Sequence, residues 1–393
     1  MEPKNLKVKT NIKFRNFILK NKFKNKKKIF NIYKKLIKEK NEVILSLGKN
    51  YKDSFSKKII QKLKKKKHFS LIGMGGSILG AKAIYKFLSP KNKKFTFVDN
   101  FSNIPFKKDN KKKVNLIISK SGNTLETISN SNIIINKKDT NIFISDNKKN
   151  YLIELANKLK SEVIHHNNFI GGRYAVLSEV GMLPTQLMGF KPDKFRRLNR
   201  LVDNKYFINS LIQNVSNIFN LINHKKNNSI ILNYDDKSND LFYWYQQLVA
   251  ESLGKKNKGI LPMISMMPKD NHSLMQYYLD GVKNNFFTFF FVKEKKSIKI
   301  KDQQILKNHS YLKNKSLNDI SYSQFLATEK VFKQKKIPFR SFVVDNRNEE
   351  TLGEIFIFFI LETILLGRLM KINPFNQPAV ELIKEQTKKI LIS

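Results

Sequence analysis

The stretch "LIGMGGSILGAKAIYKF" (residues 71–87) joins an apolar run to a glycine-rich turn and then to a helical pattern. Three glycines in four positions, Gly73, Gly75 and Gly76, would let a ligand come close to the backbone where a strand passes into a helix. A dinucleotide-binding turn, G-x-G-x-x-G, needs a third glycine where this chain has Ile78, and no Walker motif occurs anywhere. The turn therefore predicts a ligand site, but NAD and ATP both fit it poorly.

A second turn has the same character. The segment "IISKSGNTLET" (residues 117–127) places Ser119, Ser121 and Thr124 around Gly122, between a strand-like run and a helical one. Hydroxyls and free backbone N–H groups at the start of a helix suit a phosphate monoester, although such side chains can also do no more than cap the helix. Since both turns would end neighbouring strands and open at one edge of a sheet, together they favour a phosphate site.

The composition is that of a globular protein, with 393 residues of which 41% are hydrophobic and 11% aromatic. The formal net charge of +44 raises the alternative of a nucleic-acid-binding protein, but only eight of the 75 basic residues are arginine. Proteins that recognise base edges or bind phosphates through bidentate hydrogen bonds rely on arginine. The lysine runs of this chain are also scattered along its length. We therefore expect a lysine-rich solvated surface and no nucleic-acid partner.

Cysteine is absent, which excludes disulfides and thiolate metal sites, and the pair His165–His166 with scattered acids makes no convincing set of metal ligands. The longest apolar stretch, residues 355–367, contains Glu362 and is too short to span a bilayer. The first 40 residues are rich in lysine and lack the continuous apolar region of a signal peptide. We expect a cytoplasmic protein with no metal and no membrane partner.

Strand-like runs alternate with helical ones in two parts of the chain, which is the pattern of parallel βαβ units. The sequence thus predicts an α/β fold with two doubly wound units, whose mainly parallel sheets are flanked by helices. We expect a helical N-terminal segment at residues 1–65, the first unit at 66–185, a helical connector at 186–225, the second unit at 226–345 and a helical C-terminal arm at 346–393.

Six segments of the chain form a recognisable series. In order they are "GMGGSILG" (73–80), "SKSGNTLET" (119–127), "GGRYAVLSEVGMLP" (171–184), "QLVAESLGKKNKGILP" (247–262), "DNHSLMQYYLDG" (270–281) and "NPFNQPAVELIK" (373–384). The first two resemble phosphosugar-binding domains of the sugar-isomerase (SIS) type, and the other four resemble the glucose-6-phosphate isomerase family in particular. The resemblance implies reversible interconversion of glucose 6-phosphate and fructose 6-phosphate in glycolysis and gluconeogenesis, through ring opening and an enediol, without a cofactor.

The resemblance also implies roles for individual residues. Glu251 matches the base that moves a proton between C2 and C1, a task that suits a carboxylate within reach of both carbons. Arg173 matches the cation that stabilises charge on the enediolate oxygens. The residues matched to the phosphate are Ser77, Ser119, Lys120, Ser121 and Thr124, and those matched to close contact with the sugar are Gly76, Gly172 and Gln377.

Ring opening requires proton transfer at O5 and O1, and here His272 matches the family's histidine and Lys384 its assisting lysine. In the family that histidine comes from the neighbouring subunit, so the resemblance implies a homodimer with shared active sites. The chain departs from the family's pattern at three positions: Asn123 stands where many relatives have threonine, Asn376 where aspartate is usual, and Ala379 where glycine is usual. We expect these departures to affect rate and affinity more than reaction type.

Two alternatives remain open. A non-catalytic sensor of phosphosugars would need the two phosphate turns, but it would have no use for Glu251, Arg173, His272 and Lys384 together. An isomerase that also accepts mannose 6-phosphate would need all of them, because preference between the C2 epimers depends on the shape of the pocket. The sequence does not separate this second alternative from the main prediction.

Overall fold

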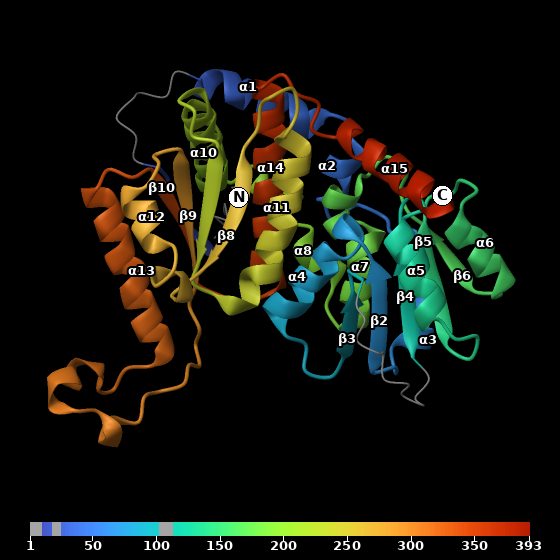
Figure 1. The fold of residues 1–393 in the computed structure, drawn as a ribbon, viewed down its shortest axis with the longest axis horizontal. Helices are drawn as coiled ribbons and strands as arrows, with labels where there is room; N and C mark the ends of the chain where they lie inside the picture. The colour runs from blue at the N-terminus through green and yellow to red at the C-terminus, as the bar shows by residue number, and fades with distance from the viewer. Residues whose placement is uncertain (1–9, 18–24, 102–112) are drawn as a thin grey trace, which may run out of the picture.

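The computed structural model describes residues 10–17, 25–101 and 113–393, which form two sheet-containing units side by side (Figure 1). Each unit has a five-stranded, mainly parallel sheet flanked by helices, so the predicted α/β fold class is confirmed. Within these ranges, no helix combines the length and the hydropathy that a membrane span requires.

The first unit contains the glycine-rich turn. Its strands are all parallel in the order β3-β2-β4-β5-β6, and the central ones are buried on both faces, as in sheets that helices cover on both sides. From β2 the chain continues to β3 on one side and then to β4 on the other, so a crevice is expected between the carboxyl ends of β2 and β4. The elements are β2 (His68–Gly73), α4 (Leu79–Leu88), β3 (Lys94–Val98), β4 (Val114–Ile118), α5 (Leu125–Ile134), β5 (Thr140–Ser145), α6 (Tyr151–Lys158) and β6 (Glu162–His165).

The second unit has the strand order β1-β10-β9-β7-β8, in which only β1 is antiparallel to its neighbour. Its central strand β9 reads "NFFTFFFV" and is buried at every residue, as a strand covered on both faces must be. The elements are β1 (Ile12–Arg15), β7 (Asn228–Asn233), α11 (Asn239–Leu253), β8 (Leu261–Met266), α12 (Met275–Asp280), β9 (Asn285–Val292), α13 (Leu317–Gln334) and β10 (Phe339–Val344).

Two of these strands correct the expectations from the sequence. The N-terminal segment is not helical throughout, because Ile12 and Phe14 alternate with exposed residues and pack as an edge strand on β10. Flanking lysines hide this short period-two pattern. Strand β8 was not anticipated because it contains Pro262, which argues against a central strand, but β8 is an edge strand, where proline is tolerated. The domain boundaries given above remain predictions.

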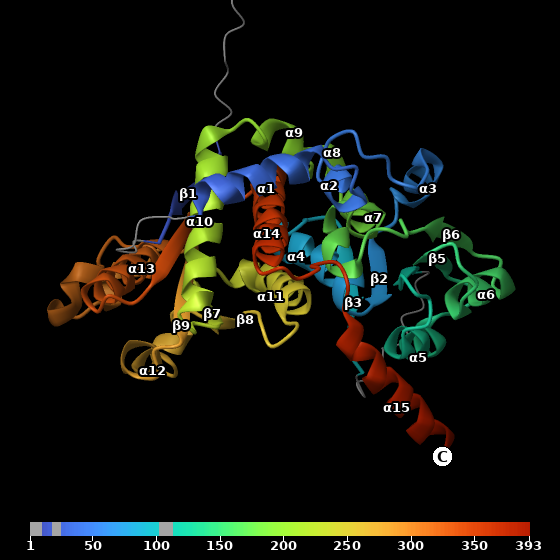
Figure 2. The same cartoon turned by 90° about the horizontal axis from the view of Figure 1, so that it is seen from above.

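The remaining helices are α1 (Lys26–Lys38), α2 (Glu42–Ser46), α3 (Lys57–Leu63), α7 (Glu179–Leu187), α8 (Pro192–Phe195), α9 (Leu198–Leu201), α10 (Lys205–Asn223), α14 (Glu349–Leu369) and α15 (Glu381–Ile392). Helix α14 packs against both α10 and α11 and is buried almost all the way round, which explains its uniformly apolar sequence (Figure 2). Its Glu362 is paired with Arg340, so the carboxylate in this apolar stretch is compensated by a buried guanidinium.

None of the twelve residues of the C-terminal helix α15 is buried. It extends away from the body of the molecule, following the loop that leaves α14 (Figure 2). Several of its apolar side chains are largely exposed: Leu382, Ile383, Ile390, Leu391 and Ile392. An isolated helix with this much exposed apolar surface is typical of an element that packs against a partner.

Candidate functional site

The two glycine-and-hydroxyl turns lie side by side, as the sequence predicted. Gly73 at the end of β2 is paired in register with Ile118 at the end of β4, and each strand leads directly into its turn. The first turn forms a short 3-10 helix, Gly75–Ser77, before α4, and the second ends at Thr124, the N-cap of α5. Both turns therefore open at the point where the strand order reverses, which is where α/β sheets bind ligands.

Two hydroxyls of the second turn, those of Ser119 and Thr124, point toward each other. Ser119 Oγ lies 2.9 Å from Thr124 Oγ1, and Ser121 Oγ accepts a hydrogen bond from the Asn123 N–H at 3.3 Å. The Thr124 side chain makes no capping hydrogen bond to α5, so its hydroxyl remains available to a ligand. The N–H groups of the first turn of α5 and this cluster of hydroxyls together form a cradle for an anion with several acceptor oxygens.

Lys120 belongs to the same turn, but its ammonium group is directed elsewhere. It donates to the carbonyl oxygens of Asn168 at 2.6 Å and Ile170 at 3.1 Å, in the segment that precedes Gly172 and Arg173. Burial lowers the pKa of Lys120, and the carboxylate of Asp146 opposes this shift. In this arrangement Lys120 ties the second turn to the segment before Arg173, and a contact with phosphate would fall to its main-chain N–H.

Gly76 lies where two backbone segments approach closely, and its predicted contact with the sugar stays a prediction. A Cβ atom at this position would lie 2.1 Å from the carbonyl carbon of Gly172 and 2.4 Å from the nitrogen of Arg173. The absent side chain therefore makes room for another backbone segment, the Gly172–Arg173 peptide. Gly75 is required for a second reason, because its φ of +51° is left-handed and Gln247 Nε2 would lie 2.7 Å from its Cβ.

The substitution Gly76→Ala should therefore displace Arg173. We expect activity to fall about a hundredfold and stability to fall by about 1–3 kcal/mol, because the new methyl group overlaps backbone that cannot move without shifting the site. Steady-state kinetics and thermal unfolding measure the two effects. Gly171→Ala is the matched control, since its Cβ would meet no atom closer than 3.9 Å. Equal losses in both variants would contradict this account.

Arg173 is the centre of the second part of the site. It lies in the 3-10 helix Gly172–Leu177, is only 2% exposed, and has an acceptor for each of its five N–H groups. Nε donates to Ser252 Oγ at 2.8 Å, and Nη1 donates to Glu251 Oε1 at 2.9 Å and to Gln377 Oε1 at 2.8 Å. Nη2 donates to the carbonyl oxygens of Pro374 at 2.7 Å and Asn376 at 3.1 Å. The guanidinium thus joins α11 to the loop that follows α14.

Glu251 stands in the last turn of α11, with both carboxylate oxygens hydrogen-bonded. Oε1 accepts from Arg173, and Oε2 accepts from Gln247 Nε2 at 3.0 Å. The sequence reasoning missed Gln247, although it lies four residues before Glu251 and so on the same helix face. Its Oε1 is buried without a hydrogen-bond partner among the described residues, which leaves an acceptor free beside the carboxylate.

The segment between β6 and Arg173 is held by a buried pair. His166 Nδ1 lies 2.6 Å from Glu179 Oε1, and its Nε2 lies 3.0 Å from the Ile170 carbonyl oxygen. The contact with His166 opposes the effect of burial, and the pKa of Glu179 is lowered overall. This histidine therefore shapes the loop that leads to Arg173. In the part of the chain that the structure describes, no group of three His, Asp or Glu side chains could hold a metal ion.

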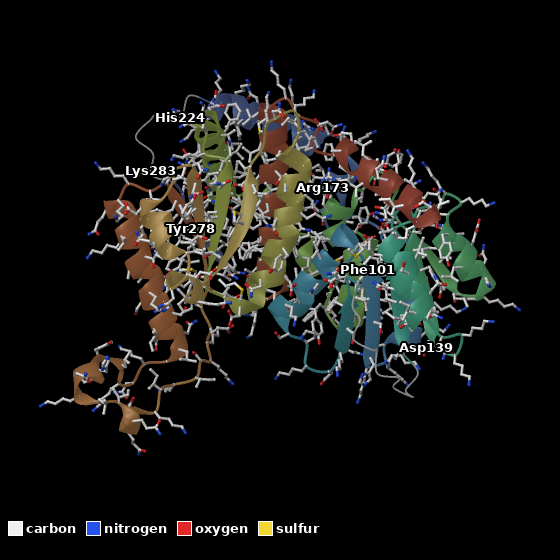
Figure 3. All side chains as sticks on the ribbon, in the orientation of Figure 1. Phe101, Asp139, Arg173, His224, Tyr278 and Lys283 are labelled. Atoms are coloured by element: carbon white, nitrogen blue, oxygen red, sulfur yellow. The ribbon has the colours of Figure 1, made fainter. Side chains whose placement is uncertain are left out.

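Two predicted residues are not brought to the site within this chain. His272 lies on an exposed turn after β8, and Lys384 lies on the projecting helix α15, where its ammonium group donates to Glu381 at 2.7 Å. Among the described residues, no hydrogen bond links either side chain to Arg173, Glu251 or Gln377. Figure 3 shows Arg173 between the two units and well apart from Tyr278, which belongs to the helix that follows His272.

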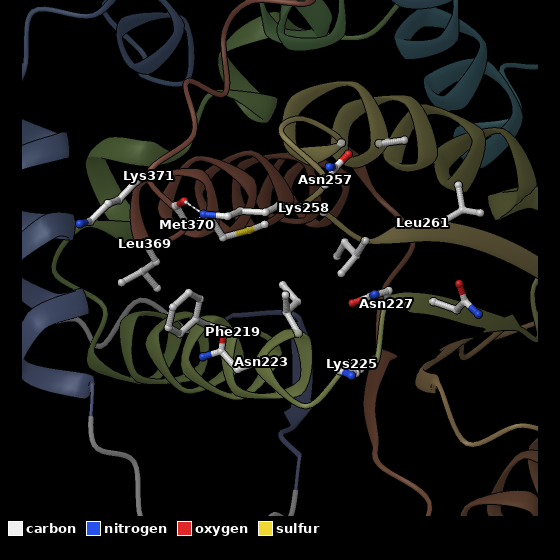
Figure 4. A pocket seen from close by; sticks show the side chains of 16 residues that line it. Phe219, Asn223, Lys225, Asn227, Asn257, Lys258, Leu261, Leu369, Met370 and Lys371 are labelled. Carbon is white, nitrogen blue, oxygen red and sulfur yellow. Dashed lines mark hydrogen bonds between the residues drawn. The ribbon is translucent and has the colours of Figure 1, made fainter.

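A cavity of about 830 Å³ lies beyond the end of α11 and does not include this site (Figure 4). It borders Ala250 and Gly254 but contains neither the hydroxyl turns nor Arg173 or Glu251. Its other walls come from the ends of α10 and α14 and from the turn before β8, and they include Phe219, Lys225, Lys258, Leu261, Leu369 and Lys371. The candidate site instead consists of the two hydroxyl turns and the cluster around Arg173, which meet through the close approach of Gly76 to the Gly172–Arg173 peptide.

Comparisons with known proteins agree on one family. Residues 34–259 match the Phosphoglucose isomerase family. The chain is 34% identical to a glucose-6-phosphate isomerase of Methanocaldococcus jannaschii over 335 residues, which are 79% of this chain and 81% of that protein. It is 33% identical to a glucose-6-phosphate isomerase of Mycoplasmopsis pulmonis over 349 residues, 82% of each protein.

Solved structures agree on the fold. A hypothetical protein from Thermus thermophilus superposes with a TM-score of 0.83 at 20% identity, over 97% of this chain and all of that one. A glucose-6-phosphate isomerase from Chlamydia trachomatis superposes with a TM-score of 0.65 at 19% identity, over 89% of this chain and 73% of that one. The order and spacing of the elements that carry the site are therefore those of a known architecture.

Proposed function

The chain belongs to the phosphoglucose isomerase family, and from this membership we propose how its residues carry out the interconversion of glucose 6-phosphate and fructose 6-phosphate. The reaction is an aldose–ketose isomerisation, a step of glycolysis that runs in reverse in gluconeogenesis. The observation that supports our assignment most is that Arg173 Nη1 donates to both Glu251 and Gln377, next to two hydroxyl-lined turns.

The phosphate group is proposed to bind across the two turns. Ser119, Ser121 and Thr124 would donate hydroxyl hydrogens, and N–H groups at the start of α5 would add the favourable end of its dipole. Ser77 is a natural partner, because its hydroxyl makes no hydrogen bond to the part of the protein that the structure describes. Binding energy from this remote group then positions the reacting carbons.

Proton transfer is assigned to Glu251. In the open-chain aldose, its carboxylate takes the proton from C2, the C1–C2 double bond forms, and negative charge develops on the carbonyl oxygen O1. The O2 hydroxyl proton passes to O1, the same carboxylic acid gives its proton to C1, and the product carries a ketone at C2 and a hydroxyl at C1. Gln247 orients one carboxylate oxygen through its amide N–H.

Arg173 is proposed to stabilise the enediolate. Because all five N–H groups have acceptors in the protein, one of these contacts must be released to the substrate oxygen. We expect the hydrogen bond from Arg173 to Gln377 to be replaced by one to the substrate oxygen, because the Gln377 side chain is exposed. The other acceptors of Arg173 are backbone oxygens, a buried serine and the base itself. Gln377 would then contact the sugar through the same amide.

Ring opening is proposed to use His272 and Lys384 from neighbouring positions in a homodimer. Neither side chain reaches Arg173 in the single chain, and both lie on exposed elements with exposed apolar neighbours: Leu261 and Met263 on edge strand β8, Leu274 and Tyr277 near His272, and Leu382 and Ile383 on α15. Pairing two copies through such surfaces would cover them and would bring His272 of one copy to the Arg173 cluster of the other. We also propose a cytoplasmic location, as the glycolytic role favours, and no nucleic-acid partner.

A coupled assay tests the proposed function. The purified protein is given fructose 6-phosphate, and formation of glucose 6-phosphate is followed with an NADP-linked dehydrogenase. We expect turnover without added metal or cofactor. Turnover should change only modestly at about 0.3 M salt, whereas an interaction driven by the net charge of the protein would weaken steeply with salt. A folded protein that binds the sugar phosphate but does not turn it over would instead be the non-catalytic sensor. The reverse assay with mannose 6-phosphate measures preference at C2.

A further inference from the structure

Residues 373–377, the loop segment that ends at Gln377, accept hydrogen bonds from two cationic side chains that belong to different elements. Arg173 donates to the carbonyl oxygens of Pro374 and Asn376 and to the Gln377 side chain. From the other side, Lys255 Nζ donates to the Asn373 carbonyl oxygen at 2.6 Å and to Asn376 Oδ1 at 3.1 Å. Lys255 lies four residues after Glu251, just beyond the end of α11, and none of the roles assigned above involves it.

The backbone that carries Lys255 is itself anchored. Lys255 and Lys258 form an isolated antiparallel β-bridge across a tight turn in which Lys256 and Asn257 both have positive φ angles. Lys258 Nζ reaches back to the carbonyl oxygen of Met370, at the end of α14, at 3.4 Å (Figure 4). The turn is thus attached to α14 just before residues 373–377 begin, so the position of Lys255 is defined relative to the loop that it holds.

We propose that Lys255 is a positioning residue of the isomerase, which holds residues 373–377 against the end of α11 and so keeps Gln377 beside Arg173 and Glu251. The inference rests on the proposed function and deepens it. Gln377 sits on a loop between the buried α14 and the projecting α15, in which Pro374 is buried and Phe375 packs on Tyr174, whereas Asn376 and Gln377 are exposed. Asn376, the residue before Gln377, accepts hydrogen bonds from Arg173 and from Lys255, and of these two cations only Lys255 does not also contact the base.

The strength of the hydrogen bonds that Lys255 donates to this loop depends on the charge of the acceptor oxygens. Both acceptors are neutral oxygens, and burial together with the nearby Arg173 lowers the pKa of Lys255 to about 8, although Glu251 opposes the shift. Holding the ammonium in place therefore costs free energy at neutral pH. A carboxylate at position 376 would offset that cost by giving the ammonium a charged partner.

The test is a set of variants in the coupled assay. We expect Lys255→Met to lower kcat about tenfold while KM for fructose 6-phosphate changes by less than about threefold, since the phosphate turns are untouched. Lys255→Arg should recover most of the loss, and Asn376→Asp should retain at least the wild-type kcat at pH 7. Lys256→Met is the matched control, because it makes the same change on the adjacent exposed residue and should leave both constants unaltered.

A double-mutant cycle decides whether Lys255 acts through Gln377. In a Gln377→Ala background, Lys255→Met should cost less than about twofold, because the side chain it positions is gone. An equal cost in both backgrounds would overturn the proposal, as would a wild-type kcat in Lys255→Met or an effect confined to KM. Asn376→Ala, which removes one acceptor and leaves Lys255 in place, gives the same readout if Lys255→Met fails to fold. An inactive wild type would refute the proposed function itself before any variant is compared.

Discussion

Glu251→Gln is expected to abolish turnover, with kcat reduced by about a thousandfold or more, because the amide cannot take the proton from C2. The structure accommodates this change unusually well. The introduced amide can still accept from Arg173 through its oxygen, and its new N–H group can be satisfied if the Gln247 amide rotates to present the oxygen that now has no partner. The fold and the binding of sugar phosphate should therefore persist while the chemistry stops.

Two measurements make this result interpretable. Thermal unfolding of Glu251→Gln should lie within a few degrees of the wild type, and fructose 6-phosphate should still raise the midpoint, as a ligand that binds only the folded state does. A variant that is folded and keeps more than about a tenth of the wild-type kcat would overturn the assignment of Glu251 and leave the isomerase without its proposed base.

The sequence predicted the elements with strong local signals. The two turns were predicted from glycines and hydroxyls at close spacing, and the parallel βαβ pattern from alternating strand-like and helical runs. Glu251 and Arg173 were assigned through the resemblance of their segments to the family. The structure brings the two turns together because Gly73 and Ile118 are in register. Such pairings follow from the rule that parallel strands share a carboxyl edge, so they could be inferred before any coordinates.

What could not be predicted depends on contacts between segments distant in the chain. Gly76 faces the Gly172–Arg173 peptide almost a hundred residues away, and Arg173 is saturated by acceptors from α11 and from residues 374–377. Neither fact has a local signature. The free Gln247 oxygen was also missed, although a carboxylate and an amide four residues apart on one helix are a signal that could have been used.

The proposed homodimer assigns the residues of each active site to two different chains. Its basis is that the predicted ring-opening residues His272 and Lys384 lie apart from the base, each on an exposed element with exposed apolar neighbours. If each active site combines Glu251 of one subunit with His272 of the other, a substitution of Glu251 and a substitution of His272 can be placed on different chains. This arrangement has a consequence that a monomer cannot reproduce.

Mixing two inactive variants should therefore restore activity. In a hybrid dimer of Glu251→Gln with His272→Ala, one site carries both defects and the other carries neither, because its glutamate and histidine come from different chains. Random re-association of equal amounts yields half hybrids, each with one intact site, so we expect about a quarter of wild-type activity. Each variant alone should be at least about a hundredfold below wild type, since each lacks a group that transfers a proton.

The measurement is the coupled assay after the two variants are unfolded together and refolded, or co-expressed with distinct tags and purified through both. Refolding each variant alone is the control for recovery. Activity that stays at the level of the separate variants, in a mixture shown by its tags to contain hybrids, would mean that His272 and Glu251 serve the same site from one chain. In that case β8, the turn with His272 and α15 would have to move toward Arg173 within a single subunit, against the hydrogen bonds that fix β8 beside β7.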